Sequence, residues 1–274
     1  MAAASKPEII PMEGHPWNFC FREDRHERSA TVTRQRLQKL IASAGVCSRR
    51  KAEDLLRDRR VHVNGQLATL GDQADLDVDT IEVDGHPLRT APQARVLLLN
   101  KPPGVICSCR DPQRRRTVLE LVPPDLREGL HPVGRLDAES RGALLLSNQG
   151  ELTLQLTHPR YNHRKTYRVT VAGLPSEKQL NQWRRGVVLD GTVTRPAEVN
   201  LVKKSPQASV LEVILREGRN RQIRRVALSL GHRVLDLQRI AIGTLTLGSM
   251  QEGCWRELSR QEWSGLISTE GERS

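Results

Sequence analysis

Hydrophobic residues recur at helical spacing in the first patterned stretch of the chain, residues 34–58. Their intervals of three or four residues predict two short helices, and these positions are Leu37, Leu40, Ile41, Val46, Ala52, Leu55 and Leu56. Ala44-Gly45 interrupts the pattern, and Ser48 is a suitable N-cap for the second helix. Strand-like residues then lead into Asn64-Gly65 and into a second turn at residue 85, which predicts short strands joined by tight turns. Residues 34–90 are therefore predicted to form one small unit.

A longer region, residues 95–262, alternates strand-like stretches with fewer helices. Strands are expected at residues 96–100, 142–146, 166–171, 209–215 and 234–237. Helices are expected at residues 150–156, 176–185 and 221–230. This alternation favours an α+β domain of catalytic size, and residues 91–94 serve as the linker that precedes it.

The two ends of the chain lack such periodicity. Residues 1–33 are interpreted as a mobile extension, and residues 263–274 as a tail. An organellar transit peptide is a weaker interpretation of the N-terminal stretch, because it contains five acidic residues that such peptides avoid. A translation start assigned too far upstream is a third explanation.

The net charge of the chain indicates what kind of partner it binds. Lys and Arg number 43 against 32 Asp and Glu, which gives a net charge of +11 and an isoelectric point near 10.0. Such an excess is typical of proteins that meet phosphates or anionic membranes. Because the longest apolar runs are only strand-sized, nucleic acid is the favoured partner and membrane insertion is disfavoured.

The five cysteines form an odd, scattered set without the spacing of a zinc site or a disulfide framework. The sequence therefore predicts a reducing compartment and no metal.

Charge is also sorted within the small unit. Residues 34–60 hold nine basic and three acidic residues, whereas residues 61–90 hold one basic and six acidic residues. This asymmetry makes the helical half the expected nucleic-acid face, although charged runs on helices more often serve only solvation. The predicted RNA contacts there are Arg36, Lys39, Ser48, Arg49, Arg50, Lys51, Arg59 and Arg60.

A candidate catalytic carboxylate lies just before the predicted strand at residues 142–146. Asp137 and Glu139 stand on either side of Ala138, and Ser140 and Gly142 permit a tight backbone turn. The pattern fits a carboxylate held at the mouth of a sheet. Taken alone, it also fits an aspartate that only caps its own turn.

Three motifs in order carry a resemblance to a known family. They are Gly134-Arg-Leu-Asp137-Ala-Glu-Ser140-Arg-Gly142, Lys165-Thr-Tyr167-Arg-Val and Glu217-Gly-Arg-Asn-Arg-Gln222-Ile-Arg224-Arg225. Two further segments, Asn100-Lys-Pro-Pro-Gly104 and Asp111-Pro, belong to the same pattern. With these motifs the chain resembles the bacterial RsuA/RluB-type rRNA pseudouridine synthases. Residues 34–90 are similar to the S-four RNA-binding domain of that family. The resemblance covers residues 34–262, but residues 57–60 contain no glycine where the family usually has one before its strand.

The resemblance implies both a fold and an activity. The fold is α+β: an S-four module, then a pseudouridine synthase domain with a mixed, mainly antiparallel sheet and flanking helices. The activity is isomerisation of uridine to pseudouridine in ribosomal RNA, with no cofactor, by a monomeric cytoplasmic enzyme. The segments at Asn100 and Asp111 resemble the members that act on large-subunit rRNA.

The resemblance also assigns roles to single residues. Asp137 matches the nucleophile, which attacks either the uracil ring or the ribose. Arg224 matches the basic residue that orients this aspartate. Tyr167 matches a tyrosine that stacks on the base or removes its proton; a plain core tyrosine is the other interpretation. Further RNA contacts are expected from Lys101, Arg114, Arg115, Arg116, Arg135, Arg219, Arg221 and Arg225.

A competing function is a non-catalytic RNA-binding or ribosome-assembly protein on the same fold. Phosphate binding alone requires neither Asp137 nor Tyr167, so their presence with Arg224 favours the enzyme. DNA-binding regulation is disfavoured, because no recognition helix is evident.

Overall fold

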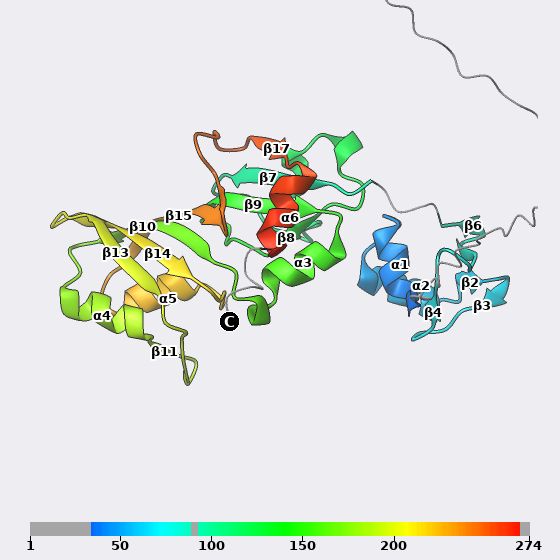
Figure 1. Cartoon of the computed structure of the whole chain (residues 1–274), viewed down its shortest axis with the longest axis horizontal. Coiled ribbons are helices and arrows are strands. Elements are labelled where there is room, and N and C mark those ends of the chain that lie inside the picture. The colour runs from blue at the N-terminus through cyan, green and yellow to red at the C-terminus, as the bar shows by residue number, and fades with distance from the viewer. Residues whose placement is uncertain (1–33, 89–92, 269–274) are drawn as a thin grey trace, which may run out of the picture. The chain divides into compact units, whose positions relative to one another are not determined.

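The computed structural model describes residues 34–88 and 93–268. The predicted N-terminal extension, most of the predicted linker and residues 269–274 lie outside the described residues. Residues 34–88 have one hydrophobic core, and residues 93–268 have two others (Figure 1).

Residues 34–88 form two helices and short antiparallel strands. The elements are β1 (Gln35–Arg36), α1 (Leu37–Ser43), α2 (Arg49–Arg57), β2 (Val61–Val63), β3 (Gln66–Leu67), β4 (Gln73–Ala74), β5 (Ile81–Val83) and β6 (His86–Pro87). Strands β3, β2, β5 and β6 pair in that order, and β1 pairs with β4. The buried helix residues, including Leu37, Ile41 and Ala52, pack against Val61 and Ile81 of the sheet. The periodic positions of the sequence therefore form this core.

Local chemistry explains the turns of this unit. The side chain of Ser48 accepts a hydrogen bond from the Lys51 amide at 3.3 Å, so the predicted N-cap is confirmed. Asn64 and Gly65 have φ values of 53° and 76°, as the predicted tight turn requires. Arg59 adopts a φ of 59° just before β2, so an arginine takes the left-handed conformation at the turn that lacks a glycine.

Residues 93–268 form one large mixed sheet with helices on both faces, and a separate two-stranded sheet made of β11 and β12. The strands are β7 (Val96–Lys101), β8 (His131–Val133), β9 (Arg141–Ser147), β10 (Lys165–Ala172), β11 (Val188–Leu189), β12 (Thr192–Val193), β13 (Glu198–Lys203), β14 (Ala208–Leu215), β15 (Val234–Ile242), β16 (Leu245–Thr246) and β17 (Trp255–Glu257). The α-helices are α3 (Gly150–Thr157), α4 (Glu177–Arg185), α5 (Gln222–Ser229) and α6 (Arg260–Ser268). The 3-10 helices are η1 (Val118–Leu121), η2 (Pro124–Leu126) and η3 (Pro159–Tyr161).

The sheet runs β13-β14-β10-β15-β9-β7-β17, with β16 added to β15 and β8 added to β9. Neighbouring strands are antiparallel except β15 and β9, which are parallel and join the two halves. Gly142 lies at this junction, where a Cβ atom would stand 2.2 Å from the carbonyl oxygen of Arg239. Glycine is needed there because the two backbones approach too closely for any side chain.

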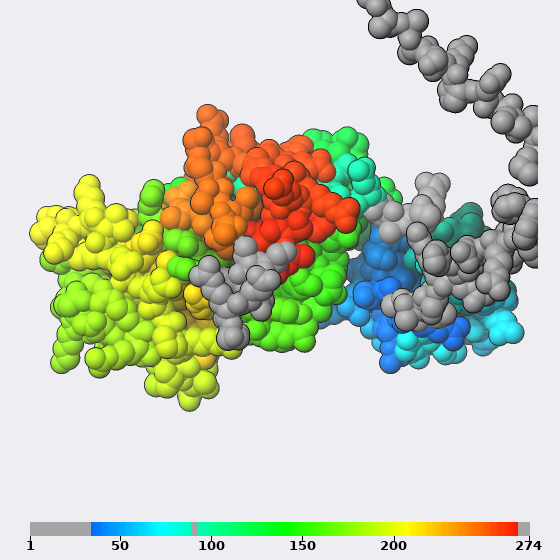
Figure 2. Space-filling view, viewed as in Figure 1, coloured from blue at the N-terminus to red at the C-terminus, as the bar shows by residue number. Residues whose placement is uncertain are grey.

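Alternate residues of the central strands enter two separate cores. Leu97, Leu99 and Leu144 face the core that α4 and α5 cover, whereas Leu98 and Leu145 face the core that α3 and α6 cover. Figure 1 shows α4 and α5 beside β10 and β14, and α3 and α6 beside β8 and β9. Figure 2 shows α6, in red, next to the orange segment that leads to β17. The continuous hydrophobic runs of β7 and β9 follow from burial on both faces.

The predicted strands and helices of this domain are all present, with ends shifted by a few residues. The elements that the sequence did not predict are the strands β8, β11, β12, β13, β16 and β17, the three 3-10 helices and α6. Helix α6 includes Trp263 and the buried Leu266, so the stretch assigned to the tail from residue 263 begins inside a packed helix. Its cap, in which Glu262 accepts from the amide and hydroxyl of Ser259, is the local signal that marks its start.

Candidate active site

The loop of residues 134–140 connects β8 to β9 and carries Asp137. Its backbone is held on both sides of that residue. The Ala138 carbonyl accepts from the Gly104 amide at 2.7 Å, and the Leu136 amide donates to the sulfur of Cys107 at 3.3 Å. These hydrogen bonds hold the backbone around Asp137 in place, while the side chain of Asp137 is 29% exposed.

The buried side chain of Lys101 also supports this loop. Its ammonium group donates to the carbonyl oxygens of Pro102, Ala138 and Ser140, at 2.9, 3.2 and 2.7 Å. The residue is 0% exposed, and burial lowers the pKa of its side chain. The prediction that Lys101 contacts RNA is therefore wrong, because its ammonium is enclosed by backbone carbonyls of the Asp137 loop.

The carboxylate of Asp137 is paired with Arg221. Arg221 Nη1 lies 3.6 Å from Asp137 Oδ2, and Arg221 Nη2 lies 3.2 Å from Glu139 Oε2. Arg221 is the N-cap residue of α5 and has a φ of 47°, in the left-handed region. Arg221 was expected to contact RNA, and the structure instead places it against the candidate nucleophile.

Arg224, one turn into α5, contacts the end of the same loop. Its Nη2 donates to the hydroxyl of Ser140 at 3.3 Å, and its Nε lies 3.9 Å from Glu139 Oε2. The side chain is 14% exposed. In the structure the ion pair to Asp137 is made by Arg221 and not, as predicted, by Arg224, whose side chain instead donates to the hydroxyl of Ser140.

The two remaining arginines of this motif support a hairpin. Arg219 donates to the carbonyls of Thr192 and Val193, at 3.0 and 2.7 Å. Arg225 makes two hydrogen bonds to Asp190, at 2.9 and 2.6 Å, and thereby lowers the pKa of that carboxyl. Both residues were predicted to contact RNA, but in the structure their guanidinium groups hold the β11–β12 hairpin to the start of α5.

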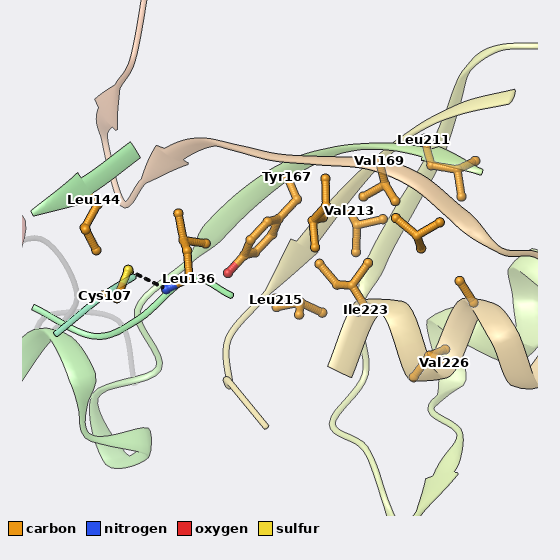
Figure 3. Packing of buried hydrophobic residues seen from close by; sticks show 14 of the residues in the cluster. Cys107, Leu136, Leu144, Tyr167, Val169, Leu211, Val213, Leu215, Ile223 and Val226 are labelled. Atoms are coloured by element: carbon orange, nitrogen blue, oxygen red, sulfur yellow. Dashed lines mark hydrogen bonds between the residues drawn. The ribbon is translucent and has the colours of Figure 1, made fainter. Parts of the chain in front are cut away.

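Tyr167 lies on β10, with Val213 on one neighbouring strand and Arg239 on the other. It is 8% exposed and belongs to the core. Figure 3 shows its hydroxyl end directed toward Leu136, the residue before Asp137. Tyr167 also lines a cavity together with Gly134 and Arg135 of the Asp137 loop. The structure thus brings the predicted tyrosine and the predicted nucleophile to one region, from two distant parts of the sequence.

Basic side chains between β7 and η1 form a second group. Arg114, Arg115 and Arg116 are exposed, as RNA contacts must be. Arg115 also donates twice to Asp111, at 3.0 and 2.6 Å, and this pairing lowers the pKa of Asp111 to about 2. Arg115 is therefore partly neutralised, whereas Arg114, with a φ of 58°, projects from the turn.

The predicted contacts of residues 34–60 divide in the same way. Those with exposed side chains on or beside the two helices are Lys39, Arg49, Arg50, Lys51 and Arg59. Ser48 is used as the helix cap, and Arg36 donates to the carbonyl of Gly71. Arg60 makes two hydrogen bonds of 2.7 Å to Asp84. The exposed set is the better candidate for RNA, because its charges remain directed to solvent.

The predicted site residues did not include three residues that contact the Asp137 loop or its arginine partners: Cys107, Glu139 and Ser140. Ser140 and Glu139 lie inside the motif around Asp137, so their position in the sequence could have identified them as site residues. Nothing in the sequence identifies Cys107, because it contacts Leu136, a residue 29 positions away. Within residues 34–88 and 93–268, no group of histidine, cysteine, aspartate and glutamate side chains is arranged to hold a metal ion. No described helix is long and apolar enough to cross a membrane.

Comparison with known proteins identifies the two parts of the chain. Residues 95–229 match the family model of RNA pseudouridylate synthase, and residues 35–77 match that of the S4 domain. The ribosomal large subunit pseudouridine synthase B of Bacillus subtilis is 39% identical over 230 residues, which are 83% of this chain and 93% of that protein. The protein of the same name from Vibrio cholerae is 36% identical over 233 residues, 83% of this chain and 73% of its own length.

A solved structure supports the same assignment. The crystal structure of a pseudouridylate synthase aligns with a TM-score of 0.63 and 30% identity, and covers 85% of this chain and 99% of that one. The order of an S4 domain before the synthase fold, predicted from the sequence, is confirmed. The chain therefore belongs to the RNA pseudouridine synthases of the RsuA/RluB type and is an isomerase of uridine in RNA.

Proposed function

We propose that this enzyme forms pseudouridine at a specific site of large-subunit ribosomal RNA, with Asp137 as its nucleophile. The observation that carries the proposal is the support of the Asp137 loop, whose carbonyls at residues 138 and 140 accept from the buried Lys101 ammonium. A turn that merely caps itself needs no such buried cation. The names of the Bacillus and Vibrio relatives support the large-subunit target.

The reaction exchanges one bond for another without adding or removing atoms. The bond between uracil N1 and ribose C1′ breaks, the base rotates, and a bond from C5 to C1′ forms. C5 loses its proton and N1 gains one. A carboxylate serves this exchange by adding to the ring or to C1′ and later leaving, which keeps the base and ribose linked to one active site.

The other residues of the site suit supporting roles. Arg221, with its Nη1 3.6 Å from Asp137 Oδ2, is close enough to hold the direction of this carboxylate. Tyr167, which lines a cavity together with Gly134 and Arg135 of the Asp137 loop, stacks on the flipped base or takes the C5 proton in this proposal. The exposed basic residues of α2 and of the 114–116 loop hold the RNA backbone.

A tritium-release assay tests the proposal. Ribosomal RNA labelled with tritium at C5 of uridine loses label only where that carbon forms the new bond. The wild-type enzyme should release tritium from large-subunit RNA that lacks the modification, and Asp137→Asn should release none while binding RNA within a few-fold of wild type. If the wild-type protein binds the RNA but releases no tritium, the alternative of a non-catalytic RNA-binding or ribosome-assembly protein is favoured.

A further inference from the structure

The parallel pairing of β15 with β9 joins two halves of the large sheet, and the site residues come from both halves (Figure 1). Asp137 lies in the loop that leads into β9, whereas Tyr167 lies on β10, next to β15. Arg221 lies at the start of α5, which Figure 1 shows beside β10 and β14. The relative placement of these three residues therefore depends on how β9 is held against β15.

The backbone ladder at this junction is short. It consists of two neighbouring pairs, Gln238 with Arg141 and Arg239 with Gly142. Strand β7, by contrast, pairs with β9 over its whole length. Tyr167 on β10 pairs with Arg239, so one row of paired residues runs from Tyr167 to the start of β9. A slip of one residue between β9 and β15 would displace the two sides of the site by about 3.3 Å.

Arg141 makes a side-chain link across the same junction. Its Nε and Nη2 donate to the two carboxylate oxygens of Asp236 on β15, at 2.9 and 2.7 Å. Its Nη1 donates to Glu252 at 2.9 Å. The next residue after Glu252 is bound to β7, because the Gly253 amide donates to the Asn100 carbonyl at 2.8 Å. One guanidinium thus ties β9 to β15 and to the segment beside β7, and paired bonds of this kind fix direction as well as distance.

The link reaches Asp137 through Ser140, the residue before Arg141. The Ser140 amide donates to the Asp137 carbonyl at 3.1 Å, which closes a tight turn between the two residues. The Ser140 carbonyl accepts from the Lys101 ammonium at 2.7 Å, and the Ser140 hydroxyl accepts from Arg224 at 3.3 Å. Because the turn is short and bonded at both ends, a shift of Arg141 along the sheet moves Asp137 with it.

Arg141 also balances two negative charges at the junction. Asp236 and Glu252 bind different nitrogen atoms of its guanidinium, so the two carboxylates lie close together. Hydrogen bonds from Arg141 lower the pKa of Asp236, which keeps this carboxylate ionised at neutral pH. Without Arg141 the two like charges would repel each other and push β15 away from the segment that precedes β17.

We propose that Arg141 is a positioning residue for the proposed reaction. Through Asp236 it holds β9 against β15 and thereby sets the place of Asp137 relative to Tyr167. This inference rests on the proposed function for its effect on catalysis. The side chain of Arg141 is 27% exposed, so an RNA phosphate is the competing partner for its guanidinium. The two assignments differ in their effects on kcat and on the salt dependence of RNA binding.

The first measurement is tritium release by the full-length protein at limiting and saturating RNA. A misplacement of about 1 Å costs roughly 100-fold in rate, so Arg141→Gln should lower kcat by at least about tenfold. KM and the salt slope of RNA binding should not change. Arg141→Lys, which keeps the positive charge, should recover most of the lost kcat. The matched control is Arg256→Gln, which removes a 2.7 Å ion pair to Glu262 within one half of the domain and should leave kcat unchanged.

A double-mutant cycle shows whether Arg141 and Asp236 act as a unit. Asp236→Asn alone should lower kcat several-fold, and the double variant should lose no more than Arg141→Gln alone, because both changes remove the same link. Losses that multiply, or a normal kcat in Arg141→Gln, would overturn the proposal. A salt slope reduced by about one in Arg141→Gln would assign the residue to an RNA phosphate instead. If Arg141→Gln does not fold, Asp236→Asn decides, and a normal kcat in that variant overturns the proposal.

Hydrogen exchange, followed by mass spectrometry, separates this inference from the proposed function. In Arg141→Gln the amides of residues 134–142 and 236–239 should exchange faster than in wild type, and in Arg256→Gln they should not. Unchanged exchange in Arg141→Gln would overturn the role of the ion pair. If the wild type releases no tritium while Arg141→Gln exchanges faster, the proposed function fails and the link between β9 and β15 stands.

Discussion

Replacing Lys101 by methionine tests whether this residue supports the Asp137 loop or contacts RNA. The change keeps the length of the side chain and removes the donor of three hydrogen bonds, to the carbonyls of Pro102, Ala138 and Ser140. Ala138 still accepts from the Gly104 amide, but Ser140 loses a 2.7 Å charged donor. The loop that carries Asp137 therefore loses its internal support while its surface keeps the same charges.

The expected magnitude follows from these contacts. Losing hydrogen bonds to a buried charge, and leaving one carbonyl unsatisfied, costs about 2–4 kcal/mol of unfolding free energy after the ammonium's own desolvation is recovered. Displacement of a reacting group by about 1 Å costs roughly 100-fold in rate. We therefore expect kcat to fall by about 100-fold. RNA affinity should stay within a few-fold, because the ammonium is fully buried.

Chemical denaturation measures the stability of Lys101→Met, and tritium release at saturating RNA measures its kcat. RNA binding is measured across a range of salt concentrations. The control is Lys178→Met, the same change at an exposed position of α4, which should alter none of these quantities. A Lys101→Met protein with normal kcat, weaker RNA binding and a salt slope reduced by about one would refute this reasoning, because that pattern marks a phosphate contact.

The remaining predictions concern RNA contacts and a helix cap. Glutamine in place of the exposed basic residues of α2 should reduce the salt slope of RNA binding by about 2–3 and leave kcat at saturating RNA unchanged; the residues are Arg49, Arg50 and Lys51. Arg225→Gln should leave RNA affinity and salt slope unchanged, because its guanidinium is bound to Asp190; a slope reduced by about one would contradict the pairing. Hydrogen bonds from Arg256 and Ser259 lower the pKa of Glu262 to about 2, below its usual 4.5. Its contribution to stability is present above pH 4.5 and is lost as pH falls through about 2, so thermal unfolding of Glu262→Gln should depend less on pH between 5 and 2 than that of wild type.

Features set by neighbouring residues were predictable from the sequence. The cap at Ser48, the turn at Asn64-Gly65 and the strands around Tyr167 all follow from local periodicity and backbone preference. Asp137 and Tyr167 also come to one region, as the motifs indicated. The proximity of these two residues depends on strand order, which the sequence pattern alone does not specify.

The individual roles of basic residues were not predictable. Lys101 is the last residue of the buried strand β7 and precedes two prolines, and nothing nearby in the sequence indicates that its ammonium donates to carbonyls 37 and 39 residues away. Arg221 and Arg224 differ by three positions on one helix start, so small differences in backbone conformation decide which of them faces Asp137. A run of basic residues in the sequence shows where positive charges lie along the chain. Whether each one contacts RNA or forms an internal ion pair depends on its burial and its tertiary partners.

The most direct test of the central claim is a map of pseudouridines in ribosomal RNA, read as adduct-induced stops of reverse transcription, from cells with and without this gene. One large-subunit site should disappear when the gene is deleted. It should return with the wild-type gene and stay absent with Asp137→Asn. Restoration of the site by Asp137→Asn would contradict the role of Asp137 as nucleophile, and an unchanged map after deletion would contradict large-subunit ribosomal RNA as the substrate.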